Sequence, residues 1–435
     1  MLIRDARLAG GRRRDVRIES ERIADVAAAG SLDEDGDDVV DADGRLLLPG
    51  AIDVHVHFRQ PGYPHKETWA TGSRSAAAGG VTTVVDQPNT DPPTVTGEAF
   101  AEKATLAADS LVDYGINGGV TEAWDPDSLF AAPLFALGEV FLADSTGDMG
   151  IDADLFADAV ERAAAAGVPV TVHAEDASLF DQSVRAGDAD GIGCDADADR
   201  WSAFRTAAAE ARAVERAVEV ASGADAQVHI AHTSTPEGID AATAAGATCE
   251  VSPHHILLSR DDLSELGTYG RMNPPLRSEA RRQAVFERVV DGTVDVVATD
   301  HAPHTVEEKE RGLWDAPSGV PGVETMLPLL LDLARRDELT YARVRDLVSA
   351  NPAAVFDLPR KGRIETGADA DVVLVDPDTP REIRGDDLHS KCGWTPFEGR
   401  QGVFPDLTLV RGRVVYERVG AEERFGTPAG ENVRR

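Results

Sequence analysis

The chain of 435 residues is long enough for one large domain and a smaller second one. It carries 77 acidic against 43 basic residues, a formal net charge of −34 at pH 7, which argues against nucleic acid as a partner. It has no run of about 18 apolar residues that could cross a membrane, no apolar signal segment at its start and only three widely separated cysteines, so we expect a cytoplasmic protein without a disulfide framework.

The two flanks of the chain share one pattern. Short, alternating β-like pieces occur at 2–4, 15–19 and 22–26, and again at 371–375 and 407–416. We expect residues 1–48 and 356–435 to pair into one small β-sandwich beside a central domain of residues 49–355.

The central region alternates between short apolar runs and alanine-rich helical patterns. The eight runs are 51–57, 81–86, 111–117, 140–143, 168–173, 226–232, 247–252 and 294–299, with helical patterns such as 154–166, 203–221 and 236–245 between them. Several helical patterns end in glycine, as at Gly167 and Gly246, where a left-handed stop is easy. The alternation predicts an α/β fold of the (β/α)₈ barrel type. A doubly wound open sheet is the alternative, but it explains less well why polar residues follow nearly every strand.

Two histidines close the first of these runs, in Asp53-Val54-His55-Val56-His57-Phe58-Arg59. Side chains of a strand alternate between its faces, so His55 and His57 point the same way, a few ångströms apart. Two nitrogens so placed can grip one metal ion, and Arg59 has the same parity and adds a fixed cation. A lone His-x-His is a weak signal, so the later strands have to supply further ligands.

Polar residues stand at the ends of the later runs, where barrel enzymes place their active sites. In chain order they are Asn89, Glu139, Asp144, His173, His232, Asn273, Asp300 and His304. Four histidines and at least two carboxylates on one rim could bind two zinc-type ions and leave a position open for water. We expect the other histidines not to bind metal. His229 should be structural and face elsewhere, His254 and His255 should shape their loop, and His301 should support the ligands from behind. His65 and His389 carry no motif and are expected at the surface.

This constellation resembles the amidohydrolase superfamily and, within it, the class I dihydroorotases, over the whole chain. The superfamily pattern is His-x-His, one histidine after each of strands five and six, and an aspartate after strand eight. Three motifs look specifically like dihydroorotase: Asp-His-Ala-Pro-His at 300–304, Met-Asn-Pro-Pro-Leu-Arg at 272–277 and Pro-Asn-Thr at 88–90. The resemblance implies reversible cyclisation of N-carbamoyl-L-aspartate to L-dihydroorotate, with loss of water, in pyrimidine biosynthesis.

The resemblance also implies two zinc ions per chain and a role for each site residue. The metal ligands would be His55, His57 and Asp300 for one ion, His173 and His232 for the other, and Glu139 or Asp144 as the bridge. The ions would lower the pKa of a shared water, with Asp300 as general acid and base. Substrate contacts would come from Arg59, Asn89, His304, Asn273 and the backbone around Ser318 and Gly319.

Strand four departs from the family pattern. Many relatives place a carboxylated lysine there, where this chain has Glu139, which already carries a carboxylate on a shorter side chain. Some bacterial dihydroorotases bridge with an aspartate near the end of this strand, a register that Asp144 matches. We favour Glu139, and a single-metal site follows if neither carboxylate reaches both ions.

Two other functions fit parts of this pattern. Allantoinases and hydantoinases share the metal ligands, but they are not expected to keep Arg59 together with Asn89, because their substrates lack the free carboxylate. A metal-free scaffold subunit that supports a carbamoyltransferase should lack the ligands, which this chain retains. The expected partner is the small-molecule substrate, and a homo-oligomer or association with a carbamoyltransferase is left open.

The basic residues include only five lysines, so nearly all the positive charge is arginine. An acid-rich, lysine-poor and alanine-rich composition resembles proteins of salt-accumulating archaea. Self-repulsion at this net charge is relieved at molar salt, where the Debye length shrinks to about 3 Å. The composition therefore predicts a halophilic protein.

Overall fold

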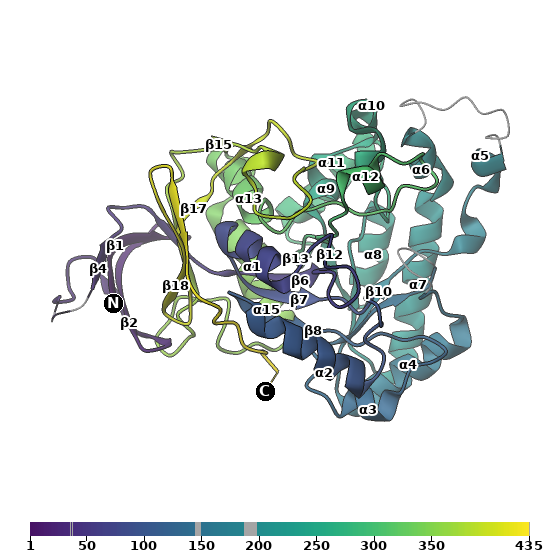
Figure 1. The fold of residues 1–435 in the computed structure, drawn as a ribbon, viewed down its shortest axis with the longest axis horizontal. Helices are drawn as coiled ribbons and strands as arrows, with labels where there is room; N and C mark the ends of the chain where they lie inside the picture. Colours follow the sequence, from purple (N-terminus) through teal and green to yellow (C-terminus); the bar gives the residue numbers. More distant parts are fainter. Residues whose placement is uncertain (35, 37, 144–148, 187–197, 435) are drawn as a thin grey trace.

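The computed structural model describes residues 1–34, 36, 38–143, 149–186 and 198–434. Figure 1 shows a barrel of strands surrounded by helices, with a curved sheet at one end that contains both the earliest and the latest strands of the chain. Asp144 and residues 187–197 lie outside the described residues.

Eight parallel strands in the described part of the chain form the barrel. They are β6 (Ala51–Val56), β7 (Val81–Asp86), β8 (Asp113–Ile116), β9 (Leu137–Phe141), β10 (Val170–His173), β11 (Val228–Ile230), β12 (Thr248–Val251) and β13 (Val296–Val297). Strands β6 to β8 and β9 to β13 form two parallel sheets. Parallel bridges from Gly118 to Leu137 and from Val56 to His301 join the sheets into a ring. The predicted barrel is thereby confirmed, and each predicted run overlaps one strand.

The longer helices around the strands are α1 (Trp69–Ala78), α2 (Gly97–Leu106), α4 (Ala153–Ala166), α7 (Ala207–Ala224), α8 (Pro236–Ala244), α11 (Glu279–Asp291) and α13 (Met326–Arg335). The shorter ones are α3 (Pro126–Phe130), α5 (Gln182–Ala186), α6 (Ala198–Phe204), α9 (Pro253–Leu257), α10 (Leu263–Leu266), α12 (Val306–Lys309), α14 (Tyr341–Arg345) and α15 (Asn351–Val355). In the part of the chain that the structure describes, no helix combines the length and apolarity needed to cross a membrane.

The single helix predicted at 203–221 is wrong, because the structure has two helices there. Helix α6 ends at Phe204, and α7 begins after Thr206, whose hydroxyl accepts a hydrogen bond from the Ala209 amide. Threonine in this N-cap geometry starts a new helix rather than continuing one. Arg205, at the break, directs its guanidinium to Glu175.

Strands from both flanks form one nine-stranded sheet. The first flank gives β1 (Leu2–Leu8), β2 (Arg13–Glu19), β3 (Arg22–Ala28), β4 (Val39–Asp41) and β5 (Leu46–Pro49), and the second gives β14 (Val372–Val375), β17 (Pro405–Val410), β18 (Arg413–Val419) and β19 (Glu422–Phe425). The order is β19-β18-β17-β14-β5-β1-β2-β3, with β4 beside β1. The flanks meet where β5 pairs antiparallel with β14, Pro49 opposite Val372. Apolar side chains of both flanks, such as Ile3, Leu47 and Leu374, share one buried core.

Two stretches of the C-terminal flank contact the barrel instead of joining this sheet. The small β15 (Arg381–Glu382) and β16 (Gln401–Gly402) ladder lies against α13, where the Val403 amide donates to Pro328. The final residues run beside β8, with the Val433 amide donating to the Tyr114 carbonyl and a parallel bridge from Tyr114 to Asn432. Backbone pairing thus draws these segments to the barrel.

Candidate active site

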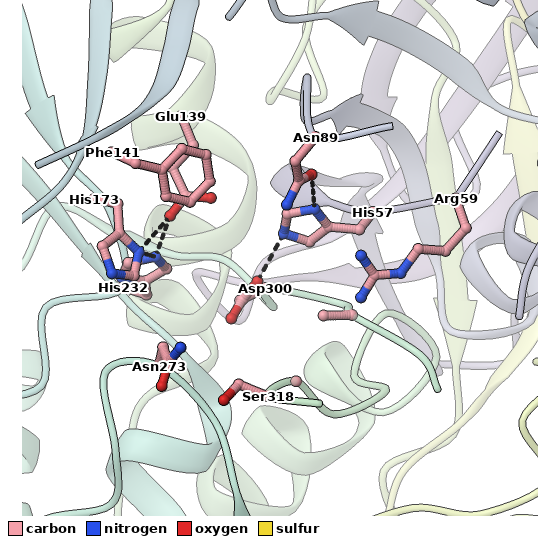
Figure 2. Close-up of a pocket in the computed structure, with 12 residues that line it drawn as sticks. His57, Arg59, Asn89, Glu139, Phe141, His173, His232, Asn273, Asp300 and Ser318 are labelled. Carbon is pink, nitrogen blue, oxygen red and sulfur yellow. Dashed lines mark hydrogen bonds and ion pairs between the residues drawn. The ribbon is translucent and has the colours of Figure 1, made fainter. Parts of the chain in front are cut away.

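A buried polar pocket lies at the carboxyl ends of the barrel strands (Figure 2). It is lined by His57, Arg59, Asn89, Glu139, Phe141, His173, His232, Asn273, Asp300, Ala302, Ser318 and Gly319. Most of the predicted site residues therefore line this one pocket. His55 lies directly against this group, since its ring centroid is 5.4 Å from that of His57 and 5.1 Å from that of His232.

Three histidines each direct one ring nitrogen, the outer one, to a side-chain oxygen of a neighbouring residue. The pairs are His55 Nδ1 with Glu250 Oε1 at 2.7 Å, His57 Nδ1 with Asn89 Oδ1 at 2.7 Å, and His173 Nε2 with Glu175 Oε2 at 2.9 Å. Carboxylate and amide oxygens only accept hydrogen bonds, so the outer nitrogen of each ring carries the hydrogen. The inner nitrogens then face the centre of the pocket, the arrangement that metal-binding histidines adopt.

Glu139 extends into this centre from β9. Its Oε1 lies 2.8 Å from Nδ1 of His173 and 2.5 Å from Nε2 of His232, and its Oε2 lies 3.3 Å from Nε2 of His55. Burial acts to raise the pKa of Glu139, but the neighbouring histidines outweigh it and hold the pKa well below its usual range. One carboxylate therefore faces histidines from both halves of the site, and Figure 2 shows it directed at His173 and His232.

Asp300 faces the other half of the site. Its Oδ1 lies 3.0 Å from Nε2 of His57 and 3.6 Å from Nε2 of His55. Burial acts to raise its pKa, yet the hydrogen bond with His57 and the charges of the histidines prevail and lower the pKa to about 2. Asp300 is therefore ionised at neutral pH and can accept a proton.

The donor set fits metal ions. Ligand atoms of His55, His57 and Asp300 lie within 4.8 Å of one another, and so do those of His55, Glu139 and His232. Nε2 of His55 and Nδ1 of His232 are buried without a hydrogen-bond partner among the described residues. A positive charge is required between the inner histidine nitrogens and the carboxylates that they face. Nitrogen and oxygen donors in a buried pocket suit a divalent ion in that position.

Arg59 places a positive charge on the opposite wall of the pocket (Figure 2). Its Nε donates to the Pro303 carbonyl at 3.3 Å, and its Nη2 lies 3.1 Å from Nε2 of His304. Within the described residues no carboxylate forms an ion pair with Arg59, and burial lowers its pKa to about 10. The side chain stays charged at neutral pH, so this wall attracts an anion.

His304 lies behind Arg59 instead of on the pocket wall. It is fully buried, with Nε2 2.9 Å from the Ser318 carbonyl and Nδ1 3.1 Å from the Lys66 ammonium. Because its ring nitrogens already have protein partners, His304 contacts the pocket only through Arg59 and Ser318.

The remaining predicted substrate contacts are partly engaged by the protein itself. The Asn89 amide oxygen accepts from the His57 ring at 2.7 Å. Asn273 Oδ1 accepts from the Trp201 indole at 3.0 Å. The Gly319 amide donates to the Arg271 carbonyl, also at 3.0 Å. A side chain at Gly319, which has φ of +130°, would come within 2.7 Å of Ala302, so glycine is required there.

Three residues of the site have a backbone conformation that non-glycine residues rarely adopt. Their φ angles are +64° at Arg59, +33° at His232 and +48° at Asp300. Each follows the end of a barrel strand, where the chain turns sharply to present its side chain to the pocket. Local strain of this kind concentrates at functional sites.

Sequence reasoning missed two buried carboxylates that hold the histidines. Glu250 lies on β12. Its Oε1 accepts a hydrogen bond from Nδ1 of His55, and its Oε2 lies 3.1 Å from Nε2 of His229. Glu175 holds His173 and is held by Arg205. A lone glutamate inside an otherwise apolar strand was the available signal for Glu250, and the shared parity with His173 was the signal for Glu175.

Both histidines predicted at the surface have exposed atoms, but to different extents: the His65 side chain is 57% exposed, whereas His389 is half-buried. Only 20% of the His389 side chain is exposed, because Glu324 and Glu423 enclose it at 2.8 and 3.2 Å. Burial acts to lower its pKa, but the two glutamates outweigh it and raise the pKa to about 9.

Comparison with known proteins identifies relatives over nearly the whole chain. A family model described as "Amidohydrolase family" matches residues 46–415. The chain is 67% identical over 418 residues to a dihydroorotase of Halobacterium salinarum, covering 96% of each chain. It is 44% identical over 398 residues to a dihydroorotase of Methanosarcina acetivorans, covering 87% of this chain and 84% of that one.

Among solved structures, the L-hydantoinase (dihydropyrimidinase) from Arthrobacter aurescens superposes with a TM-score of 0.93 at 28% identity, covering 100% of this chain and 99% of that one. The dihydropyrimidinase from Brevibacillus agri superposes with a TM-score of 0.89 at 26% identity, covering 100% and 98%. The similarity to a Halobacterium protein agrees with the acidic, lysine-poor composition.

Proposed function

The chain belongs to the amidohydrolase family and, within it, to the dihydroorotases, and from that premise we propose that it interconverts L-dihydroorotate and N-carbamoyl-L-aspartate. The environment of Arg59 is the observation that supports this substrate. A buried guanidinium without a carboxylate partner in the described residues faces a pocket rich in metal-type ligands. Dihydroorotate carries the carboxylate that such a cation can hold by charge-assisted hydrogen bonds.

We further propose two zinc ions as the resident metals. His55, His57 and Asp300 would hold one and His173 and His232 the other. Glu139 would bridge, supported by its two oxygens facing histidines of both halves. Asp144, the rival bridge, lies outside the described residues and stays a prediction.

Asp300 performs the proton transfers in this proposal. When bound, the metal ions supply an acidified water and polarise the ring carbonyl. The ionised Asp300 takes a proton from the water while the oxygen of that water forms a bond to the ring amide carbon. Asp300 then returns the proton to the ring nitrogen as the carbon–nitrogen bond breaks, which gives N-carbamoyl-L-aspartate. Cyclisation follows the same steps in reverse and releases water.

The other pocket residues orient the ring for this attack. Arg59 would hold the carboxylate, and Asn89, which lines the same pocket, would share that contact. Asn273 and Ser318 lie below Asp300 in Figure 2, on the side of the pocket away from Glu139. Asn273 and the backbone around Ser318 and Gly319 would contact the ring amides. His304 serves by supporting Arg59 and the Ser318 backbone.

Hydantoinase or dihydropyrimidinase activity is the second candidate, because the solved structures named above have those activities and superpose closely. Their substrates lack a carboxylate, so they would leave Arg59 buried and unpaired. A cyclic amide without that group should therefore bind this pocket poorly.

A substrate panel tests the proposal. Purified protein in about 2 M KCl, where its charge is screened, is supplied with Zn²⁺ and offered dihydroorotate, dihydrouracil, hydantoin and allantoin. We expect turnover of dihydroorotate, with Arg59→Met as the matched variant that loses it and keeps its metals. Turnover of hydantoin or dihydrouracil without dihydroorotate would reject the assignment. Zinc-to-protein ratios by mass spectrometry test the metal proposal separately, and a cytoplasmic location, a homo-oligomer and association with a carbamoyltransferase stay predictions.

A further inference from the structure

The five lysines of this chain occupy unusual positions. Lys103, Lys309 and Lys361 are buried, Lys66 is partly buried and Lys391 is exposed, while the other 38 basic residues are arginines. Lys103 is paired with Asp86 and Lys361 with Asp113 and Asp371. Lys309 forms no ion pair with any carboxylate in the described part of the chain, although no part of it is exposed.

The Lys309 ammonium instead donates to three backbone carbonyls. Its Nζ lies 3.0 Å from the oxygen of Arg271, 3.0 Å from that of Pro317 and 3.1 Å from that of Gly319. Lys309 ends the short helix α12, which follows the Asp-His-Ala-Pro-His motif directly. One ammonium therefore connects the segment after strand β13 with two other loops.

Both of these loops carry the wall of the pocket. Ser318 and Gly319 line it, and Asn273, which also lines it, is two residues after Arg271. The Arg271 carbonyl accepts from the Gly319 amide as well, and the Arg271 Nε donates to the Ser318 hydroxyl at 3.2 Å. The two loops are thus hydrogen-bonded to each other next to the Arg271 carbonyl, which also accepts from Lys309.

We propose that Lys309 is a positioning residue for substrate binding, which fixes the Arg271–Asn273 and Pro317–Gly319 segments at the distance that the substrate ring requires. It does not touch the substrate. A compact ammonium directs three hydrogens from one nitrogen at three carbonyls, whereas the donors of the arginine guanidinium are spread over three nitrogens in one plane. This geometry accounts for a lysine at a buried place in a chain that otherwise uses arginine. The inference rests on the proposed function for the identity of the ring.

Lys309→Met tests this role, because methionine keeps the length and removes every donor. Lys361→Met is the matched control: it removes another buried lysine, in an ion-pair network away from the pocket. Steady-state kinetics on dihydroorotate in about 2 M KCl are combined with metal analysis and hydrogen exchange of residues 268–273 and 317–320. We expect the KM of Lys309→Met to rise about tenfold, with kcat and metal content changed far less, since misplaced binding groups weaken substrate positioning. Exchange in both loops should become faster.

The control separates positioning from general stability. Lys361→Met should melt at a lower temperature but keep the parent KM and the parent exchange in the two loops. A KM within about twofold of the parent in Lys309→Met, or an equal rise in Lys361→Met, would overturn the inference. If Lys309→Met does not fold, Lys309→Gln, which keeps one donor group, should show a smaller rise in KM. If the parent does not process dihydroorotate, the proposed function fails, and loop exchange alone then decides the positioning role.

Discussion

Replacing Arg59 with methionine should make the protein more stable and nearly inactive. Methionine fills a similar space without the charge, and it keeps the φ of +64° that Arg59 already adopts. The side chain is 3% exposed and has no carboxylate partner among the described residues, so the substrate is what completes its interactions. Removing the cation therefore acts in opposite directions on folding and on turnover.

The structure gives the size of both effects. Burial lowers the Arg59 pKa from 12.5 to about 10, which corresponds to about 3 kcal/mol of unfavourable free energy for the buried charge. Removing this unfavourable free energy should raise the melting temperature by about 3–6 °C in a chain of this size. Truncating one partner of a buried charge pair weakens it by about 2–5 kcal/mol, so kcat/KM should fall on the order of 10²- to 10³-fold.

The assay compares three proteins in about 2 M KCl: parent, Arg59→Met and Arg59→Lys. The lysine variant keeps the charge but not the two-pronged contact, so it should lose turnover without gaining stability. Melting is followed by calorimetry, turnover by dihydroorotate hydrolysis and metal content by mass spectrometry. If Arg59→Met melts below the parent and retains turnover within about tenfold, the reasoning about an unpaired substrate-binding cation is wrong.

Four other predictions follow from the charges and the metal site. The melting temperature and activity should rise between about 0.1 M and 2 M KCl as repulsion is screened; a flat thermal profile would refute the halophilic reading. Glu139→Ala should lower the metal content from two ions towards one after dialysis, whereas Asp144→Ala should leave it near two, and a reversed result would make Asp144 the bridge. Glu250→Gln should weaken metal binding about 10- to 100-fold by disturbing His55, which titration with Zn²⁺ would measure; unchanged affinity would leave Glu250 a packing residue. The pKa of His389 is raised to about 9, so the stability that it contributes is fully present below about pH 6.5 and lost as the pH rises through about 9. In denaturant titrations, His389→Gln should lower the free energy of unfolding by about 1 kcal/mol at pH 6, after allowance for solvent screening, and should not change it at pH 10. An equal loss at both pH values would contradict this.

Features that depend on local periodicity could be predicted from the sequence. The two-residue repeat placed His55 and His57 on one face, and their rings are indeed neighbours. Alternating strands and helices identified the barrel, and Gly167 ends α4 in the left-handed conformation that its position suggested. These features follow from residues close together in the chain.

The rest depended on contacts between distant segments. Glu250 is 195 residues from the His55 that it holds, and no local pattern links the two. The three carbonyls around Lys309 belong to Arg271, Pro317 and Gly319, and no local pattern links Lys309 to Arg271, 38 residues away. His389 is enclosed because Glu324, 65 residues away in the chain, and Glu423, on β19, both reach it. Such partners are chosen by tertiary packing, which a single sequence does not display.

The sheet shared by the two flanks also sets an order of events during synthesis. Strand β5 pairs with β1 on one side, but its other edge must wait for β14, which is translated only after the entire barrel. Until then, a leucine-rich edge strand stays open, and exposed edges of that kind invite pairing with other chains. Synthesis that stops between the barrel and β14 therefore gives a chain with the whole barrel sequence and an open β5 edge, so that pairing of β5 with β14 shows that translation has passed residue 375.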